Sequence, residues 1–215
     1  MAGPVRQRNQ RGHGGRLRGE ILEAAVRVID DASCEAEVSL RGIARAAGIS
    51  TMSVYGHFAN RQELLSAAAE LSWEQVSREI TAQSQPSDEP RTRLLLGCRA
   101  YVGFAQLNPL RYTMMTQVDR SSQAAQRTLD ILIRALLACG TVDSAILDHR
   151  ESHKIAAALS VALHGVAMLH RTDTPGLWLS NFSTSDVITT LVDASILHLE
   201  HVAAAPLSRQ KPSPR

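Results

Sequence analysis

The sequence predicts an all-α protein, and three observations carry this prediction. Hydrophobic residues make up 44% of the 215 residues and aromatic residues only 4%, so the core must be built from aliphatic side chains. The chain is rich in Ala and Leu, which favour helices over strands. Its apolar residues recur at helical spacing along most of the chain, whereas no segment shows a convincing strand pattern.

Each expected helix is bounded by capping residues or by breakers. Ser39 caps the second helix and Gly48 ends it, while Ser50 or Thr51 opens the third. Asn60 begins an Asn-x-x-Glu capping box at the start of the fourth. The expected helices span about residues 17–32, 39–47, 51–58, 60–80, 91–107, 109–117, 121–139, 148–171 and 185–202.

The N-terminal stretch is strongly basic. Residues 1–20 carry five arginines against one acidic residue, Glu20, which gives a local net charge of +4. Such an arm can bind phosphate groups, and composition alone equally allows a disordered tail that aids solubility. We expect order to begin near Arg16, because the stretch from Gly12 to Gly15 is too rich in glycine for a helix.

Composition and motifs disfavour several other classes of protein. The cysteines Cys34, Cys98 and Cys139 show no CxxC spacing, so we expect reduced thiols in a cytoplasmic protein. No run of about 18 apolar residues predicts a membrane span, and no apolar segment follows the basic N-terminus as a signal peptide would. No nucleophile, phosphate-loop or dinucleotide motif occurs, so we expect no enzyme and no cofactor. His149 and His153 have the spacing of metal ligands on one helix face, but no third ligand is near in sequence, so we expect a solvated face and no metal site.

The segment Ser39–Phe58, which reads SLRGIARAAGISTMSVYGHF, predicts two short helices joined by a tight turn. Gly48 lies where the end of the first helix needs a left-handed backbone, which glycine adopts at no steric cost. The small Ala47 lets the helices approach closely, and Ile43 can pack against Val54. This pattern predicts a helix-turn-helix, a motif whose second helix lies in the major groove of DNA, although other Ala-rich helix pairs share the same pattern.

The residues that follow carry a family resemblance. The string VYGHFANRQELL resembles the signature of the TetR family, in which a Tyr-x-His-Phe run ends the recognition helix before a basic residue and a Leu pair. The first helix, RGEILEAAVRVID, and the turn, IARAAGIS, also resemble this family, so the resemblance spans about residues 15–75. It implies a dimeric DNA-binding regulator, with repression as the expected outcome and a small-molecule effector.

The resemblance places the start of the recognition helix against the bases. Thr51, Met52 and Ser53 open this helix, and residues at such a position face base edges in the major groove. Their side chains permit little direct readout beyond contact with a thymine methyl group. Tyr55 and His57 match the pair that donates hydrogen bonds to phosphate oxygens. The alternative is that they only cover the exposed face of the helix.

Further phosphate contacts are expected from residues around the two helices. Arg61 matches a cation near the start of the fourth helix, where its charge and the helix end both attract a phosphate. Ser39 has the corresponding place on the first helix of the pair, and Arg41 and Arg45 lie on a polar face that can flank the duplex. Gly56 departs from the larger residue usual in the family and leaves that position without a DNA-contacting side chain.

Two long helices near the C-terminus are expected to form a dimer surface, because a single head makes too few contacts for a specific operator. Their apolar stripes consist of Ile155, Ala158, Leu159, Ala162 and Leu163 on one helix and Val187, Leu191, Ala194 and Leu197 on the other. The alternative is that these stripes fill the core of one chain. Both can hold, since each helix has more than one apolar face.

A ligand pocket is expected among the middle helices, as the resemblance implies. Its candidate lining residues are Tyr101, Phe104, Met114, Met115, His164, Met168 and Trp178. Methionine suits an adaptable pocket, and plain core packing is the alternative for these side chains. The segments NPLRYTMM and LHGVAMLH also resemble landmarks of a TetR subgroup with an Asn-Pro and a Trp…His-Gly segment, although Ser160 and Val161 stand where the Trp is expected.

These expectations divide the chain into four parts. A disordered basic arm spans residues 1–14, a helix-turn-helix domain 15–62, a helical effector-binding and dimerisation domain 63–203, and a disordered tail 204–215. The expected protein is a cytoplasmic regulator that binds a palindromic double-stranded DNA operator as a homodimer and is released by a small, partly hydrophobic effector. The alternatives are an accessory DNA binder without small-molecule control and a helical ligand-binding protein that has lost operator binding.

Overall fold

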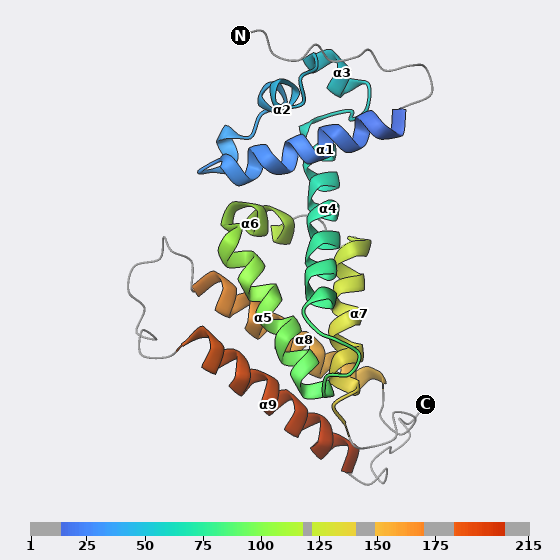
Figure 1. The fold of residues 1–215 in the computed structure, drawn as a ribbon, viewed down its shortest axis with the longest axis vertical. Coiled ribbons are helices and arrows are strands. Elements are labelled where there is room, and N and C mark those ends of the chain that lie inside the picture. Colours follow the sequence, from blue (N-terminus) through green and yellow to red (C-terminus); the bar gives the residue numbers. More distant parts are fainter. Residues whose placement is uncertain (1–13, 118–121, 141–148, 170–182, 205–215) are drawn as a thin grey trace, which may run out of the picture. The chain divides into compact units, whose positions relative to one another are not determined.

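The computed structural model describes residues 14–117, 122–140, 149–169 and 183–204, which form helices joined by turns (Figure 1). The predicted all-α class is confirmed for these residues. The chain divides into two compact units, Met1–Gln75 with Asn108–Ala125 and Val76–Leu107 with Gln126–Arg215. This division differs from the boundary expected at residue 62, because a segment after residue 107 packs back on the first helix.

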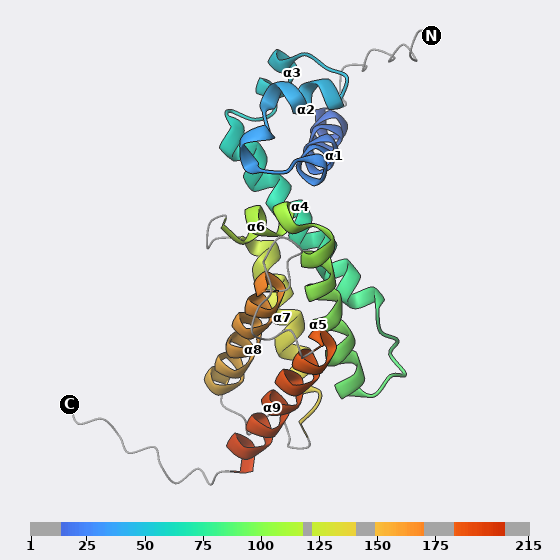
Figure 2. The same cartoon turned by 90° about the vertical axis from the view of Figure 1, so that its left-hand side faces the viewer.

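The first unit contains the predicted head and one further helix. Its elements are α1 (Gly14–Asp31), the short turn η1 (Glu35–Glu37), α2 (Leu40–Ala46), α3 (Thr51–Tyr55), the start of α4 (Arg61–Ala82) and α6 (Pro109–Gln117). In both views α2 and α3 lie at one end of this unit and α6 at the other (Figures 1 and 2). A single core of buried side chains from all of these helices holds the unit together.

Two helix ends in this unit differ from the sequence expectation. Helix α1 already begins at Gly14, so the glycines there do not delay the helix until Arg16. Helix α3 ends at Tyr55 instead of continuing to Phe58. The reason is tertiary, because Phe58 is 1% exposed and the chain leaves the helix at Gly56 to bring this ring into the core.

Helix α6 is fastened to α1 by a buried arginine. Arg111 is 5% exposed, and its Nε lies 3.0 Å from Oδ1 of Asp30. The same guanidinium donates hydrogen bonds to the side-chain oxygens of Gln75 and Asn108. Burial raises the pKa of the Asp30 carboxyl, and the charge of Arg111 lowers it to a smaller extent.

The second unit is a helical bundle. It contains the end of α4 together with α5 (Pro90–Leu107), α7 (Gln123–Leu137), α8 (His149–Leu169) and α9 (Thr184–Ala204). Helices α5, α8 and α9 pack against one another, and their aliphatic side chains form one core. Gly97 of α5 meets α4 closely, since a Cβ there would lie 3.1 Å from Cγ2 of Ile80.

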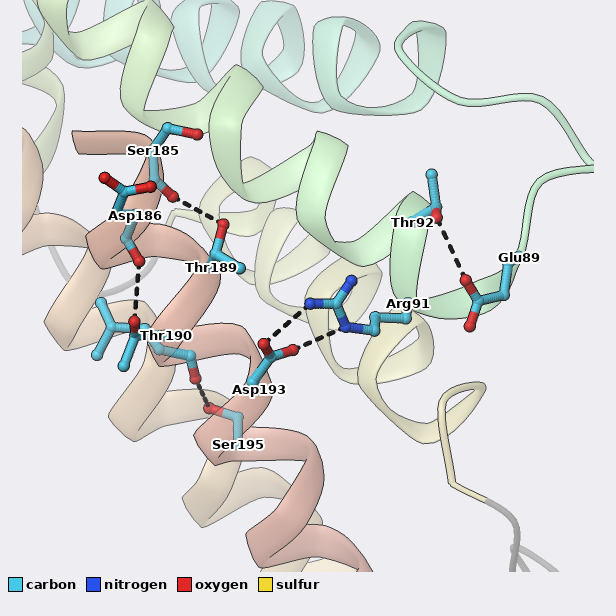
Figure 3. Close-up of polar contacts among 10 residues, drawn as sticks. Glu89, Arg91, Thr92, Ser185, Asp186, Thr189, Thr190, Asp193 and Ser195 are labelled. Atoms are coloured by element: carbon cyan, nitrogen blue, oxygen red, sulfur yellow. Dashed lines mark hydrogen bonds and ion pairs between the residues drawn. The ribbon is translucent and has the colours of Figure 1, made fainter. Parts of the chain in front are cut away.

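Polar contacts join the surfaces of α5 and α9 (Figure 3). The guanidinium of Arg91 donates two hydrogen bonds to the carboxylate of Asp193, with N–O distances of 2.7 and 2.9 Å. These bonds lower the pKa of Asp193 and raise that of Arg91. Arg99 of α5 also donates to the hydroxyl of Ser185 at 2.8 Å. Two contacts along the helices therefore fix the register of α9 on α5.

Helices α8 and α9 are more apolar than the sequence analysis expected. By length and composition alone, Arg150–Leu169 and Thr184–Ala204 reach the level of a membrane-spanning helix. Core helices of helical bundles reach the same level, and these two pack against each other and against α5. Their apolar content is therefore explained in part by the core of the second unit.

Candidate nucleic-acid interface

The predicted helix-turn-helix is present, and local capping fixes both of its helices. The hydroxyl oxygen of Ser39 accepts a hydrogen bond from the backbone N–H of Gly42 at 3.1 Å and caps α2. Gly48 has a φ of 66°, the left-handed turn conformation that the sequence predicts. Ser50 is the residue that caps α3, because its hydroxyl oxygen accepts from the N–H of Ser53 at 3.1 Å.

Buried side chains beneath the pair hold α3 in place. Ile43 of α2 and Val54 of α3 are both fully buried, as the pattern predicts, and Phe58 lies in the same core. The guanidinium of Arg18 in α1 lies over the ring of Phe58, 4.8 Å from its centroid. A cation over an aromatic face is attracted by the ring quadrupole, so this contact ties α1 to the turn after α3.

The outer face of α3 exposes an unusual pair of side chains. Met52 is 78% exposed and Tyr55 is 51% exposed, whereas Thr51, Ser53 and His57 are half-buried. The hydroxyls of Ser50 and Ser53 lie 2.8 Å apart in a hydrogen bond of their own. The helix therefore offers an apolar thioether and a phenol hydroxyl to whatever approaches it.

Arg61 is engaged within the protein. Its Nε donates to the backbone carbonyl of Val38 at 2.9 Å, and one terminal nitrogen donates to the carbonyl of Glu35 at 3.0 Å. The other terminal nitrogen donates to the carboxylate of Glu35 at 3.1 Å. The arginine thus ties the start of α4 to the turn before α2. The sequence did not indicate this contact, since its partners lie more than twenty residues away.

The start of α4 carries the predicted capping box. The side-chain oxygen of Asn60 accepts from the N–H of Glu63 at 2.8 Å, and the carboxylate of Glu63 accepts from the N–H of Ala59 at 2.7 Å. These bonds satisfy backbone donors at this end of the helix.

The remaining predicted DNA contacts are at the surface of the head. Ser39, Arg41 and Arg45 are exposed on and beside α2. Gly56 ends α3 with a φ of −69° and is exposed. Of the basic arm, residues 1–13 lie outside the described residues, and Arg16 is paired with Glu20 along α1 at 3.0 Å.

The predicted ligand-binding residues are divided between the two units. Met114 and Met115 belong to α6 in the first unit and are buried. In the second unit Phe104 is 2% exposed and packed away, whereas Tyr101, His164 and Met168 are half-buried. Trp178 lies outside the described residues.

The residues predicted to form the dimer surface are partly in the core and partly on the surface of the second unit. Ile155, Leu159 and Leu163 of α8 belong to the core of the second unit. On the same two helices Val161 is 72% exposed and Leu197 65% exposed. Of the predicted residues, Ala158, Ala194 and Leu197 are therefore on the surface.

The three cysteines are free; Cys98 is buried and Cys139 is half-buried. Burial raises the pKa of Cys98 to about 12 and that of Cys139 to about 11. Both thiols are therefore protonated at neutral pH, and a protonated thiol is a poor nucleophile. Cys34 is exposed.

Several solved structures share this fold. A protein with unknown function from Rhodococcus sp. RHA1 is 24% identical, with a TM-score of 0.68, 89% of this chain covered and 100% of that one. The TetR family transcriptional regulator PfmR from Thermus thermophilus is 18% identical, with a TM-score of 0.55, 82% of this chain covered and 97% of that one. BioQ, solved with its natural double-stranded DNA operator, is 21% identical, with a TM-score of 0.58, 82% of this chain covered and 98% of that one.

Two families match successive parts of the sequence. Residues 21–68 match the bacterial regulatory proteins of the tetR family, and residues 94–194 match the tetracyclin repressor-like C-terminal domain. The second match includes the Asn-Pro and His-Gly segments. None of the curated proteins matches this chain. The two matches cover most of the chain, and the protein is a member of the TetR family of transcriptional regulators, with a helix-turn-helix DNA-binding domain.

Proposed function

We propose that this regulator is a repressor that binds a palindromic operator as a homodimer in the cytoplasm and leaves it when a small molecule binds. The observation that carries the DNA-binding part is the outer face of α3, where Met52 is 78% and Tyr55 51% exposed. Both side chains stand on a helix that Val54 anchors in the core. A rigid helix with exposed contact residues is what major-groove reading requires.

The proposed contacts follow from this face. Thr51, Met52 and Ser53 approach base edges, with the Met52 thioether against a thymine methyl group. The hydroxyl of Tyr55 and the imidazole of His57 donate to phosphate oxygens.

Charged and capping residues around the pair complete the proposed contact with the backbone. Arg41, Arg45 and Ser39 flank the duplex. Arg61 supports the interface by holding the turn before α2, and it reaches a phosphate only by exchanging its contact with Glu35.

A dimer is supported by the apolar surface of α8 and α9. Only 17% of the long apolar stretch of α9 is buried within the chain. Val161 and Leu197 project from these helices, and the exposed Ala158 and Ala194 permit close helix approach. A two-fold axis would place the same patch of two copies face to face, as in most homodimers. Such a dimer presents two heads to two related half-sites.

We propose that the effector binds in the second unit, where the half-buried Tyr101, His164 and Met168 combine polar groups with a flexible apolar side chain. To release DNA, this molecule must bind the DNA-incompetent state more tightly than the competent one.

The test is binding of the full chain to fluorescent DNA from upstream of its own gene, beside a duplex of the same composition in scrambled order. We expect tight binding of one or more dimers to the first duplex only, with an affinity that falls steeply as salt rises. Equal binding to both duplexes would favour the accessory DNA binder. Absence of binding to both at low salt would show that the head no longer recognises an operator.

A further inference from the structure

A cavity of about 170 Å³ lies inside the first unit, between α1, α4 and α6. Its α4 wall is formed by Leu65, Ala68, Ala69 and Ser72, each at most 7% exposed. These positions follow i, i+3, i+4 and i+7 spacing, so they lie on one face of the helix. Three of the four side chains are small, and this is why space remains beside α6.

Helix α6 forms the opposite wall, where the side chains are flexible and the backbone is held in place. Met114 and Met115 of α6 line the cavity, and unbranched methionine side chains can adjust to an occupant. The indole N–H of Trp73 in α4 donates to the backbone carbonyl of Met115 at 3.2 Å. This bond holds α6 at its distance from α4.

The polar groups of the cavity define the chemistry of an occupant. The buried hydroxyl of Ser72 donates to the carbonyl of Ala68 at 2.8 Å, so its oxygen is available as an acceptor. Arg111 also lines the cavity, and the carboxylate of Asp30 at 3.0 Å balances its charge. The exposed Glu35, Gln62 and Gln117 line the remaining side and mark the route to solvent, and the carboxylate of Glu35 is paired there with Arg61.

We propose that this cavity binds a small neutral molecule with a flat or branched apolar body and one hydrogen-bond donor. The size follows from volume, because an engineered apolar cavity of about 150 Å³ in another protein holds benzene. The donor is required by Ser72 Oγ, and the apolar body by Leu65, the alanines and the methionines. A charged molecule is disfavoured because the Arg111–Asp30 pair is already balanced and burial of a further charge is costly.

This site goes beyond the effector site proposed above, which lies in the second unit. All residues that line the cavity belong to the first unit, the unit that carries the helix-turn-helix. Its occupation can be measured without DNA.

The test uses the full chain with isotope-labelled methionine methyl groups, titrated with indole and with phenol. We expect the signals of Met114 and Met115 to shift and to saturate, while those of Met52 on α3 and Met168 on α8 stay in place. Toluene, which lacks the donor, should bind several-fold more weakly, and benzoate should not bind. Unchanged Met114 and Met115 signals at millimolar indole would overturn the proposal.

A matched pair of variants tests the position of the site. Ala69→Leu fills the cavity and should weaken indole binding by about tenfold or more, whereas Ala82→Leu at the exposed end of α4 should bind like the wild type. Ala69→Leu with wild-type affinity for indole would contradict the assignment.

Ser72→Ala tests the hydrogen bond between the donor of the bound molecule and Ser72 Oγ. This test remains valid even if Ala69→Leu does not fold. The substitution should weaken indole binding several-fold and leave toluene binding unchanged. An equal effect on both molecules would overturn the role of the hydroxyl. DNA binding is measured in a separate experiment. A chain that binds indole but no operator would refute the proposed repressor function and would leave the proposed cavity site in place.

Discussion

Tyr55 and His57 differ in how far they reach from the surface of the head. Tyr55 is 51% exposed at the end of α3, whereas His57 is half-buried just after it. A phenol hydroxyl at an exposed position can be removed without disturbing the fold, because the ring keeps its packing. It is therefore the cleaner probe of the proposed phosphate contact.

Tyr55→Phe should weaken DNA binding by about tenfold, because one hydrogen bond to a charged phosphate is lost. The loss should be equal for operator and scrambled DNA, since phosphate contacts carry no sequence information. Fluorescence anisotropy measures both affinities, and an unchanged midpoint of urea unfolding is the control that the variant keeps its fold. A loss confined to the operator would instead place the hydroxyl against a base.

Replacing Gly48 and replacing Gly56 by alanine should have different effects on the stability of the head. Gly48→Ala should lower the free energy of unfolding by about 1 to 2 kcal/mol, because its φ of 66° is strained for any residue with a Cβ. Gly56→Ala should leave it unchanged or raise it by up to about 1 kcal/mol, because its φ is −69° and the new Cβ would meet only Ser53 O at 3.4 Å. Urea unfolding of both variants measures the difference, and a loss of equal size in both would contradict this interpretation of the turn.

At the scale of helices, the features that local rules govern were predictable and the tertiary ones were not. The caps at Ser39 and Asn60 and the turn at Gly48 depend on residues within four positions, so the sequence contains them in full. The contacts of Arg61 with Glu35 and of Arg111 with Asp30 join distant parts of the chain. Neither pair belongs to a periodic pattern, and their partners could be identified only once the helices were packed.

The same limit applies to the candidate sites. Apolar spacing marked α8 and α9 as packing helices, but it could not show which of their faces the monomer buries. The structure assigns Ile155 and Leu163 to the core and leaves Val161 and Leu197 outside. Likewise the sequence placed Met114 and Met115 in a pocket among the middle helices, whereas the cavity that they line lies in the first unit and depends on the return of α6 to α1.

The link between α1 and α6 predicts a pH dependence. Burial raises the pKa of Asp30 above its ordinary value of 3.8, so the carboxylate is less favourable in the folded chain than in the unfolded chain. The contribution of this group to stability is therefore complete below the unfolded pKa and is lost as pH rises through the folded pKa. Asp30→Asn removes the titration. We compare the free energy of unfolding of the wild type with that of Asp30→Asn. The value for the wild type minus that for the variant should fall as pH rises from the unfolded pKa, and it should level off toward neutrality.

Unfolding by urea at several pH values measures this difference in free energy. The prediction concerns how the difference changes with pH and not its absolute size. Glu23→Gln, at an exposed position two turns earlier on α1, is the control for the loss of one charge from this helix. A difference that grows with rising pH would mean that attraction to Arg111 outweighs burial.

For the whole molecule, the proposed function depends on two copies acting together. If two heads read a palindromic operator as proposed, a chain that cannot dimerise should keep its folded head and lose most of its operator affinity. The exposed apolar residues of α8 and α9 are the place to test the proposed dimer, because their side chains contribute little to the core of one chain.

Leu197→Asp should convert the dimer to a folded monomer, because a carboxylate on the proposed two-fold interface would face apolar surface and its own copy. Leu107→Asp is the matched control, since Leu107 is 83% exposed at the end of α5 and Leu197 is 65% exposed on α9. Sedimentation analysis should show a monomer only for Leu197→Asp, with unchanged helicity. Operator binding should weaken by orders of magnitude in that variant alone, because the second half-site contact becomes a separate binding event. A dimeric Leu197→Asp with full operator affinity would move the interface away from this face of α9.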